Sequence, residues 1–347
     1  MNVDFSPFTL DLQTSFRTAG QSVADRRGIV IRLRDDAGIG VGEATPLAGW
    51  TESYERCRRW IESFATRPPP TPASIALPRD RPAARHAVQL AVMDGSARRA
   101  GRPLAQYLRA GSSQTIPLNA TVPATTTDET VRAVSAAVDA GFDTIKLKVG
   151  RSSVVDDVRR IEAVRAAIGD SPSIRLDANR SWTLDQAHEA LARLGRHDIA
   201  YVEEPLRTPT KQTLLEIRRH GVPVALDESL NRGGWMMLSE LERAVEAVIL
   251  KPMSLGGVDR VVSAARRAKS LGMLPVISGT LDGAIARTAA MHVAAALTPH
   301  TAAGLATAEY VCADIGLDPV RIVDGTAHLP STPGIGLDGP WTNGAQP

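Results

Sequence analysis

Short apolar runs that each end in a charged residue recur through the middle of the chain. They are rich in Val, Ile and Leu, which is typical of parallel strands buried on both faces. The runs are TIKLKVG (144–150), IRLDANR (174–180), YVEEPL (201–206), VALDESL (224–230) and AVILKP (247–252). Their charged positions follow one another at intervals of 24 to 29 residues, enough for a strand, a loop, a helix and a return loop. The pattern therefore predicts consecutive β/α units.

Segments with the apolar spacing of amphipathic helices separate these runs, and similar units flank them. We predict a first strand at Thr115–Val122, a seventh at Leu274–Ser278 and an eighth at Thr301–Leu305. The predicted helices are Asp128–Ala140, Val154–Ile168, Leu184–Leu194, Lys211–His220, Leu238–Val245, Gly257–Leu271 and Ala284–Leu297. Eight strands joined by seven helices indicate the α/β class and a (β/α)7β barrel, which is a modified TIM barrel, over residues 114–311.

The remaining segments predict a second structural unit beside the barrel. Residues 1–113 carry β-rich stretches at 3–12 and 28–47, followed by helices at Ser53–Phe64 and Arg85–Ala100, which is typical of an α+β capping domain. Between the two β-rich stretches, Ser15–Arg27 is polar and is expected to be a mobile loop. Residues 312–347 have no room for another β/α unit, so we expect them to pack back on the capping domain and complete it.

Composition limits the classes of function. The 347 residues include 43% hydrophobic residues, enough for a large core, and 40 basic residues nearly balance 38 acidic ones. A net charge of +2 predicts no nucleic-acid footprint and no anionic membrane surface as partner. Two cysteines, Cys57 and Cys312, do not make a disulfide framework. No run approaches the roughly 20 apolar residues of a membrane span, and no signal peptide is visible, so we expect a cytoplasmic protein.

The charged residues that end the runs are candidates for catalysis. Parallel strands place their carboxyl ends at one rim of a barrel, where TIM-barrel enzymes carry their active sites. The residues there are Lys148, Asp177, Glu203, Asp227 and Lys251. Converging carboxylates repel one another, and a hard divalent cation with oxygen ligands removes the repulsion. Asp177, Glu203 and Asp227 are therefore predicted to bind Mg²⁺, with Mn²⁺ as a possible substitute.

The lysines indicate proton transfer at carbon. A metal ion can stabilise the oxyanion of an enolate while a lysine takes the proton. Lys146 and Lys148 lie two positions apart and so share one face of their strand, where neighbouring ammonium groups lower one another's pKa. Lys148, nearer the strand end, is the predicted base. The alternative for any single charge is an ordinary structural ion pair at the rim.

The ordered set of motifs resembles the enolase superfamily, in its muconate lactonising enzyme-like subgroup. The motifs are Lys146-Leu147-Lys148, Asp177-Ala178-Asn179, Glu203-Glu204-Pro205, Asp227-Glu228-Ser229 and Leu250-Lys251-Pro252. The resemblance implies that Asp177, Glu203 and Asp227 are the Mg²⁺ ligands and that Lys148 and Lys251 are catalytic on opposite faces of the substrate. It assigns Lys146 an auxiliary role. Arg175 and Asn179 share a face with Asp177 and are expected to support the site.

Within this subgroup the chain most resembles the o-succinylbenzoate synthase family. The similarity lies in Phe16-Arg17-Thr18-Ala19, in residues 42–50 (GEATPLAGW) and in Ser278-Gly279-Thr280-Leu281-Asp282. It implies a Mg²⁺-dependent syn-dehydration of 2-succinyl-6-hydroxy-2,4-cyclohexadiene-1-carboxylate to o-succinylbenzoate in menaquinone biosynthesis, through an enediolate. Ser278, Gly279 and Thr280 are expected to donate hydrogen bonds to the succinyl arm. The expected partner is thus a small carboxylate; the sequence does not predict an oligomeric state.

Three alternatives remain open at this point. The first is an N-succinylamino acid racemase, or an enzyme with both activities, because the same two lysines can act as two bases. The second is another lyase or isomerase of the muconate lactonising type. The third is a barrel without catalysis that serves as a scaffold. Ala306 stands where relatives often carry Asp, and the absence of acidic residues at 305–307 weakens a dipeptide epimerase, which needs them for its substrate's ammonium group.

Overall fold

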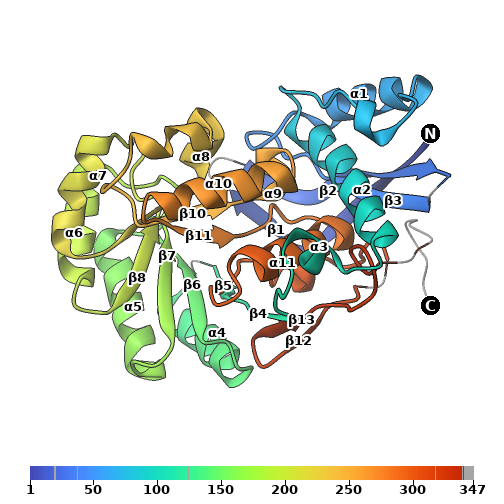
Figure 1. Cartoon of the computed structure of the whole chain (residues 1–347). Helices are drawn as coiled ribbons and strands as arrows, with labels where there is room; N and C mark the ends of the chain where they lie inside the picture. The colour runs from blue at the N-terminus through green and yellow to red at the C-terminus, as the bar shows by residue number, and fades with distance from the viewer. Residues whose placement is uncertain (19–20, 37, 124, 317, 338, 340–347) are drawn as a thin grey trace.

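The structure, a computed structural model, has two parts that lie side by side. It describes residues 1–18, 21–36, 38–123, 125–316, 318–337 and 339, with the side chains of residues 14–18, 21–24 and 232–233 left out of the description. In Figure 1 the capping part, with its antiparallel sheet and helices α1 and α2, lies on the right. The strands of the parallel sheet curve on the left, and helices α4 to α7 cover the sheet's outer side.

The capping part is built from three antiparallel strands in the order β1-β2-β3 and three helices that follow them. Gly40 and Gly42 on β3 face helix α2, where a Cβ atom at either position would clash with the carbonyl of Ala91 or Ala87. These glycines therefore allow the sheet and the helix to pack closely. The elements are β1 (Asn2–Thr18), β2 (Gln21–Asp35), β3 (Gly38–Ala44), α1 (Tyr54–Thr66), α2 (Pro82–Arg99) and α3 (Leu104–Leu108).

The predicted loop at Ser15–Arg27 is wrong for the part that the structure describes. Strand β1 continues to Thr18, and β2 begins at Gln21, so the segment forms the end of a long hairpin. The pairing of Phe16 with Val23 extends the ladder beyond a register shift that follows Asp11. Residues 19 and 20 of the predicted loop lie outside the described residues. Antiparallel pairing with β1 satisfies the backbone of this polar segment, which its composition did not indicate.

Seven parallel strands form the curved sheet, in the order β11-β10-β9-β8-β7-β6-β5, and this confirms the predicted barrel architecture beside a cap. The strands are β5 (Ala120–Val122), β6 (Thr144–Lys148), β7 (Ser173–Asp177), β8 (Ile199–Glu203), β9 (Val224–Leu226), β10 (Ala247–Leu250) and β11 (Leu274–Ile277). The helices are α4 (Thr127–Asp139), α5 (Val154–Ile168), α6 (Leu184–Leu194), α7 (Lys211–Ile217), α8 (Glu228–Gly233), α9 (Pro252–Leu255), α10 (Val258–Ser270) and α11 (Ala284–Leu297). Helices α5, α6 and α11 have the predicted bounds.

Isolated bridges close the ring where regular strands were predicted. Ala303 pairs with Leu118 and Gly304 with Ser278, so residues 303–304 link the first and last strands of the sheet. The predicted eighth strand is therefore reduced to these two bridges. The predicted first strand is also split, because β4 (Thr115–Pro117) belongs to another sheet and only β5 joins the barrel.

The predicted helix at Leu238–Val245 is wrong. Helix α8 begins instead at Glu228, directly after strand β9, and a 3₁₀ helix at Trp235–Ser239 follows it. Positive φ angles of 69° interrupt the chain at Gly234, before the predicted span, and at Arg243, within it. The apolar residues of this span lie in turns that pack over the barrel. The helix of this β/α unit is α8, which stands directly after strand β9.

The segment after the barrel contacts the capping part and the start of the barrel. Strands β12 (Arg321–Val323) and β13 (Thr326–His328) pair with β4 in the order β12-β13-β4. Farther along, the Gly334 carbonyl accepts a hydrogen bond of 2.7 Å from the Leu104 N–H, and the Ile335 N–H donates to the Asp94 carboxylate at 2.8 Å. These contacts agree with the expectation that the segment packs back on the cap. The proposed boundaries at 113/114 and 311/312 stay predictions.

A glutamate of the cap also binds the first turn of a barrel helix. Glu43 on β3 is fully buried and accepts hydrogen bonds from the Gly283 N–H at 2.7 Å and the Ala286 N–H at 2.8 Å. These donors belong to the N-terminus of α11, whose free N–H groups favour a carboxylate. Burial, together with the charge of Asp282, raises the pKa of Glu43 to about 7. A side chain of the capping part thus satisfies free N–H groups at the N-terminus of a barrel helix.

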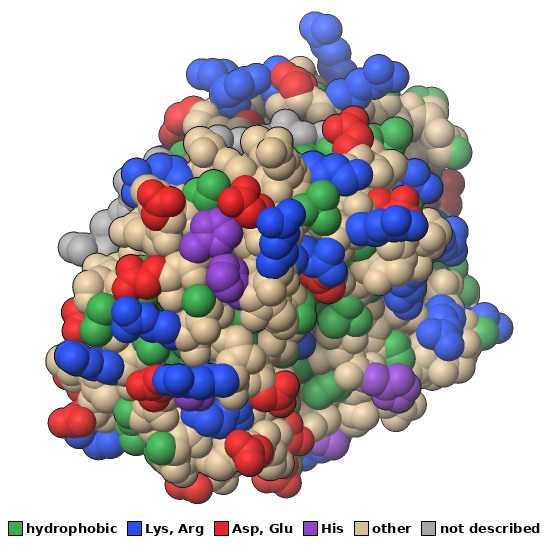
Figure 2. All heavy atoms as spheres, turned by 90° about the vertical axis from the view of Figure 1, so that its left-hand side faces the viewer, with side chains coloured by type: hydrophobic (Ala, Val, Ile, Leu, Met, Phe, Trp, Pro, Cys, Tyr) green, Lys and Arg blue, Asp and Glu red, His purple; other side chains and the backbone are tan. Residues whose placement is uncertain are grey.

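Charges of both signs alternate on the outer face of the barrel. Figure 2 shows this face, the left-hand side of Figure 1, with Lys and Arg interspersed among Asp and Glu. Ion pairs such as Arg196–Glu162 at 2.5 Å and Arg193–Glu189 at 3.1 Å contribute to the pattern. Among the described residues, the helices are too short or too polar to cross a bilayer.

Acid is expected to destabilise the protein through His292. This buried side chain accepts the Ala105 N–H at its Nδ1 (3.3 Å), and its Nε2–H donates to the Ile335 carbonyl (3.3 Å), so it joins α11 to α3 and the last segment. Burial lowers the pKa of His292 from 6.5 to about 4. Its stabilisation is therefore complete above pH 6.5 and is lost as the pH falls toward 4, by about 3 kcal/mol.

Urea unfolding between pH 7 and 4 measures this effect. In His292→Gln the free energy of unfolding should depend less steeply on pH than in the wild type. The matched control is His300→Gln, because His300 is exposed and should leave the slope unchanged. Equal slopes for the wild type and His292→Gln would contradict the prediction.

Candidate active site

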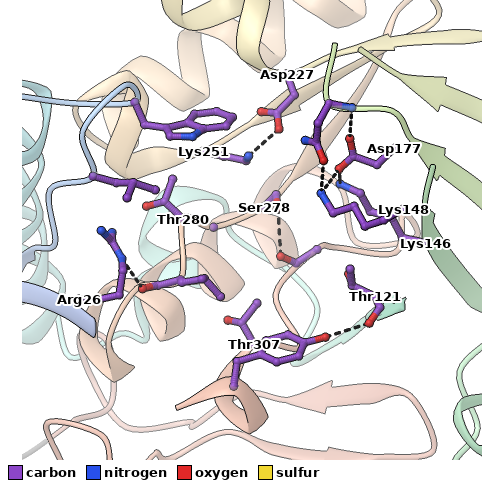
Figure 3. A pocket seen from close by; sticks show the side chains of 17 residues that line it. Arg26, Thr121, Lys146, Lys148, Asp177, Asp227, Lys251, Ser278, Thr280 and Thr307 are labelled. Carbon is purple, nitrogen blue, oxygen red and sulfur yellow. Dashed lines mark hydrogen bonds and ion pairs between the residues drawn. The ribbon is translucent and has the colours of Figure 1, made fainter. Parts of the chain in front are cut away.

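A pocket lies at the carboxyl ends of the barrel strands, beneath the cap. It encloses about 820 Å³ when the part open to solvent is included. Figure 3 shows that its side chains come from the strand ends and from the capping part. The lining residues include every predicted site residue except Arg175 and Glu203. Those that line it are Lys146, Lys148, Asp177, Asn179, Asp227, Lys251, Ser278, Gly279 and Thr280.

The strand register brings the charged residues together. Lys148 is paired with Asp177 across β6 and β7, and Asp177 with Glu203 across β7 and β8. The Lys148 Nζ donates to the Asp177 Oδ2 at 2.6 Å and to the Asn179 Oδ1 at 2.8 Å. The base predicted from sequence is therefore held by two oxygen acceptors at the edge of the pocket, with 14% of its side chain exposed.

Lys146 lies deeper, between two carboxylates. Its Nζ is 2.8 Å from the Asp177 Oδ2 and 2.7 Å from the Glu203 Oε2. Burial opposes the charge of Lys146, but Asp177 and Glu203 raise its pKa well above the ordinary value. Burial likewise opposes ionisation of Asp177, yet Lys146 and Lys148 hold its pKa well below the usual range. The expectation that the neighbouring lysines depress each other's pKa is thus wrong for Lys146, because the carboxylates dominate.

Lys251 approaches the pocket from another side, as Figure 3 shows. Its Nζ is 2.5 Å from the Asp227 Oδ2 and 3.8 Å from the centre of the Trp50 ring. A cation over an indole face is stabilised by the ring's electrons. Trp50 belongs to the loop after β3, so the cap contributes directly to the surroundings of a predicted catalytic lysine.

Glutamates next to the motif carboxylates position the strand ends. Glu204 is buried and accepts hydrogen bonds from the Asp227 N–H at 2.9 Å and from the Ser229 N–H at 2.6 Å. Burial, with the charge of Glu228, raises the pKa of Glu204 to about 7. The Glu228 Oε1 accepts the Asn179 Nδ2–H at 2.9 Å. Both residues support neighbours at the strand ends, Glu204 through the backbone of Asp227 and Glu228 through Asn179.

The carboxylates fit a hard cation in chemical type and in charge. Burial and the charges of Glu203 and Glu228 raise the pKa of Asp227 well above normal, and Lys251 offsets this only in part. A divalent cation beside the Asp227 oxygens would favour the ionised form of this carboxyl group. In the part of the chain that the structure describes, no three ligating side chains converge closely enough to hold an ion, because lysine ammonium groups lie between the carboxylates. The assignment of Asp177, Glu203 and Asp227 as Mg²⁺ ligands stays a prediction.

Three further predicted residues are placed differently from the expectation. The Ser278 hydroxyl donates to the Gly304 carbonyl at 3.1 Å, and the Thr280 hydroxyl donates to Asp282 at 2.5 Å. Their hydroxyl protons are thus used within the protein. Arg175 is buried below the pocket, where it donates to the Ala302 carbonyl at 2.7 Å. Its supporting role in the site stays a prediction.

The pocket also contains residues that the sequence did not single out. Arg26 on β2 and Tyr310, after the last barrel bridge, both line it, and the Tyr310 hydroxyl donates to the Thr121 carbonyl at 2.9 Å. Arg26 was included in the predicted loop. The sequence carries no clear signal for it, because residues 28–31 are all buried and the strand shows no alternation that would distinguish Arg26 from Arg27.

Sequence comparisons place these observations among known proteins. A family model described as enolase C-terminal domain-like matches residues 129–340. An o-succinylbenzoate synthase of Thermobifida fusca is 38% identical over 216 residues, which span 61% of this chain and 65% of that relative. An o-succinylbenzoate synthase of Salmonella arizonae is 30% identical over 302 residues, with 83% of this chain and 87% of that relative covered. An N-succinyl-L-Arg/Lys racemase of Bacillus cereus is 26% identical and covers 82% and 81%.

Solved structures share the whole fold. The L-Ala-D/L-Glu epimerase of Bacillus subtilis has a TM-score of 0.87 at 25% identity, covering 97% of this chain and 98% of that one. A dipeptide epimerase of Cytophaga hutchinsonii, solved with Mg and the dipeptide D-Ala-L-Val, has a TM-score of 0.83 at 26% identity and covers 96% and 94%. These matches confirm the resemblance inferred from the motifs. Because the family model covers more than half of the chain, the protein belongs to the enolase C-terminal domain-like family, within the enolase superfamily.

Proposed function

We propose that the protein is an o-succinylbenzoate synthase that dehydrates 2-succinyl-6-hydroxy-2,4-cyclohexadiene-1-carboxylate. The observation that carries this proposal is the charge of the pocket. Its described lining residues include four basic side chains, Arg26, Lys146, Lys148 and Lys251, against two carboxylates, Asp177 and Asp227. Such a lining favours a substrate with more than one negative charge. The proposed substrate has two carboxylates, and o-succinylbenzoate synthases are among the relatives.

Lys148 carries the proton transfers. In its neutral form, the Lys148 amine takes the proton α to the ring carboxylate and becomes an ammonium group, and the electron pair of the broken C–H bond enters the carboxylate to give an enediolate. The electrons then form the new ring double bond as the C–O bond breaks. Lys148 returns its proton to the departing hydroxide, and water leaves. Because one lysine serves both steps, the proton and the hydroxyl leave from the same face.

Other groups of the site stabilise the charge that develops. Lys251, held between Asp227 and the Trp50 ring, places a positive charge at a different side of the pocket from Lys148 (Figure 3). Asp177, Glu203 and Asp227 would hold Mg²⁺, which supplies electrostatic stabilisation of carboxylate oxygens when bound. The dipeptide epimerase of C. hutchinsonii, solved with Mg, supports this assignment.

Racemisation of N-succinylamino acids is the alternative that shares the same features. Its substrates also carry a succinyl group and a second carboxylate, and the B. cereus racemase is among the relatives. A racemase needs a second base on the opposite face, which would be Lys251. Dipeptide epimerisation has less support, because residues 305–307 (Leu-Ala-Thr) offer no carboxylate for a substrate ammonium group.

The test is to incubate the purified protein with the cyclohexadiene substrate and Mg²⁺ while following the loss of diene absorbance. We expect turnover that EDTA abolishes and that Mg²⁺ restores. Absence of turnover by a folded protein that binds Mg²⁺ would overturn the synthase assignment. The parallel assay measures exchange of the α-proton of N-succinylamino acids in D₂O. Lys251→Arg should stop any racemisation while some dehydration remains, which separates the two activities.

A further inference from the structure

Arg26 brings to the pocket a positive charge that the mechanism does not use. The residue is 2% exposed and lines the pocket from strand β2. Figure 3 shows it across the pocket from Lys146, Lys148 and Asp177. A group bound at Arg26 would therefore lie at the far end of a substrate whose reacting carbon faces Lys148.

The hydrogen bonds of Arg26 leave part of its guanidinium available. Its Nη2 donates to the Thr45 carbonyl at 2.6 Å, its Nη1 to the Pro46 carbonyl at 2.9 Å and its Nε to the Leu281 carbonyl at 3.3 Å. A guanidinium has five N–H groups, so one remains on each Nη after the bonds made by the described residues. Among these residues, all carboxylates lie more than 4.0 Å from the Arg26 guanidinium, so Arg26 forms no ion pair with them.

The nearby carboxylates are engaged with other donors. Asp282 and Glu43 are the two whose charges favour ionisation of Arg26 most strongly. Glu43 accepts the N–H groups at the start of α11, and Asp282 accepts the Thr280 N–H at 3.0 Å as well as its hydroxyl. These carboxylates therefore act as acceptors for backbone and hydroxyl groups, and the Arg26 guanidinium has no carboxylate partner among the described residues.

The other polar side chains predicted to hold the succinyl arm are less suited to a carboxylate. The hydroxyl protons of Ser278 and Thr280 are donated to the Gly304 carbonyl and to Asp282, so these hydroxyls offer only acceptors to a ligand. The three lysines of the pocket pair with carboxylates at the opposite rim. Arg26 is thus the pocket cation, among those described, that is not paired with a carboxylate.

We propose that Arg26 binds the terminal carboxylate of the succinyl arm and so selects substrates with a second negative charge at the end of a short chain. The inference rests on the proposed function, because it takes the substrate's other carboxylate to lie near Lys148. Two N–H groups on separate nitrogens suit the two oxygens of a carboxylate, and such charge-assisted bonds are stronger than neutral ones. The bonds to Thr45, Pro46 and Leu281 fix the guanidinium between cap and barrel before the substrate arrives.

The first experiment changes the ligand and leaves the protein intact. Calorimetry would compare the binding of o-succinylbenzoate with that of its derivative whose terminal arm carboxylate is a primary amide. The wild type should bind the dicarboxylate about 10- to 100-fold more tightly than the amide. Equal affinity for the two ligands would overturn the proposal.

The second experiment changes Arg26. Arg26→Met should weaken binding of o-succinylbenzoate to the level of the amide and leave amide binding unchanged, whereas Arg26→Lys should keep part of the preference. In turnover, KM should rise more than kcat falls. A loss of affinity that is equal for both ligands would show a purely structural role and overturn the proposal. If Arg26→Met does not fold, the comparison of the wild type with Arg26→Lys decides.

The turnover assay separates this inference from the function on which it rests. A wild-type protein that dehydrates the cyclohexadiene but does not discriminate between the two ligands would overturn the role of Arg26 alone. A wild type that neither turns over the substrate nor binds o-succinylbenzoate would overturn both.

Discussion

A Lys148→Ala variant is expected to lose about 10³- to 10⁴-fold in kcat for the dehydration, because a single side chain serves first as base and then as acid. The variant should bind o-succinylbenzoate with nearly wild-type affinity, since its other pocket cations remain. Stopped-flow loss of diene absorbance measures the rate, and calorimetry measures product binding. The same variant should also fail to exchange the substrate's α-proton with D₂O.

The matched control is Lys211→Ala. Lys211 is exposed at the start of α7, so its removal should leave kcat and KM unchanged. A Lys148→Ala protein that retains more than about a tenth of the wild-type kcat would contradict the assignment of Lys148 as the base. Lys146 would then be the next candidate, although its ammonium lies between Asp177 and Glu203.

An Asp177→Asn variant is expected to lose both activity and the stabilisation that Mg²⁺ gives the wild type. At a Mg²⁺ concentration about 100 times the Kd, binding should stabilise the wild-type fold by about 2.7 kcal/mol. The variant removes the carboxylate that pairs with two lysines and that lies beside Glu203 in the strand register. Thermal unfolding with and without Mg²⁺ measures the difference for each protein separately, which removes any change in the variant's intrinsic stability.

Asp170→Asn serves as the control, because Asp170 is exposed after helix α5, away from the strand ends. Its Mg²⁺-dependent shift in Tm should equal that of the wild type. A shift in Asp177→Asn as large as in the wild type would rule out Asp177 as a ligand. If the wild type itself shows no shift, the metal assignment fails and a scaffold without catalysis regains support.

Local sequence patterns predicted the barrel strands well where a buried apolar run ends at a charged residue. Strands such as Thr144–Lys148 and Ser173–Asp177 are apolar runs that stop at a charged residue, because a charge is tolerated only at the rim. Helices α5 and α6 have the predicted bounds because Ser153 and Thr183 cap them with side-chain hydrogen bonds to the third residue of each helix. Regular spacing of these elements then brought the charged residues to one edge.

The features that the sequence did not predict depend on contacts between distant segments. The hairpin end at 14–27 is stabilised by pairing of β1 with β2, and β4 left the barrel because it pairs with β13 more than 200 residues later. Arg26 became a pocket residue through the carbonyls of Thr45, Pro46 and Leu281, which no local pattern connects. The pairing of Lys146 with Glu203 likewise follows from three-dimensional packing. A buried charge without a partner would be strongly destabilising, and the fold places these two side chains together.

The contacts of Gly334 and Ile335 with the cap bear on how the chain folds during synthesis. Leu104 and Asp94 bind the backbone of residues that leave the ribosome only after every barrel strand has been made. The cap therefore reaches its full set of contacts only after the barrel strands have been synthesised. In a nascent chain that stops before residue 334, the cap would lack the Ile335 N–H that the buried Asp94 carboxylate accepts, and its packing would be incomplete.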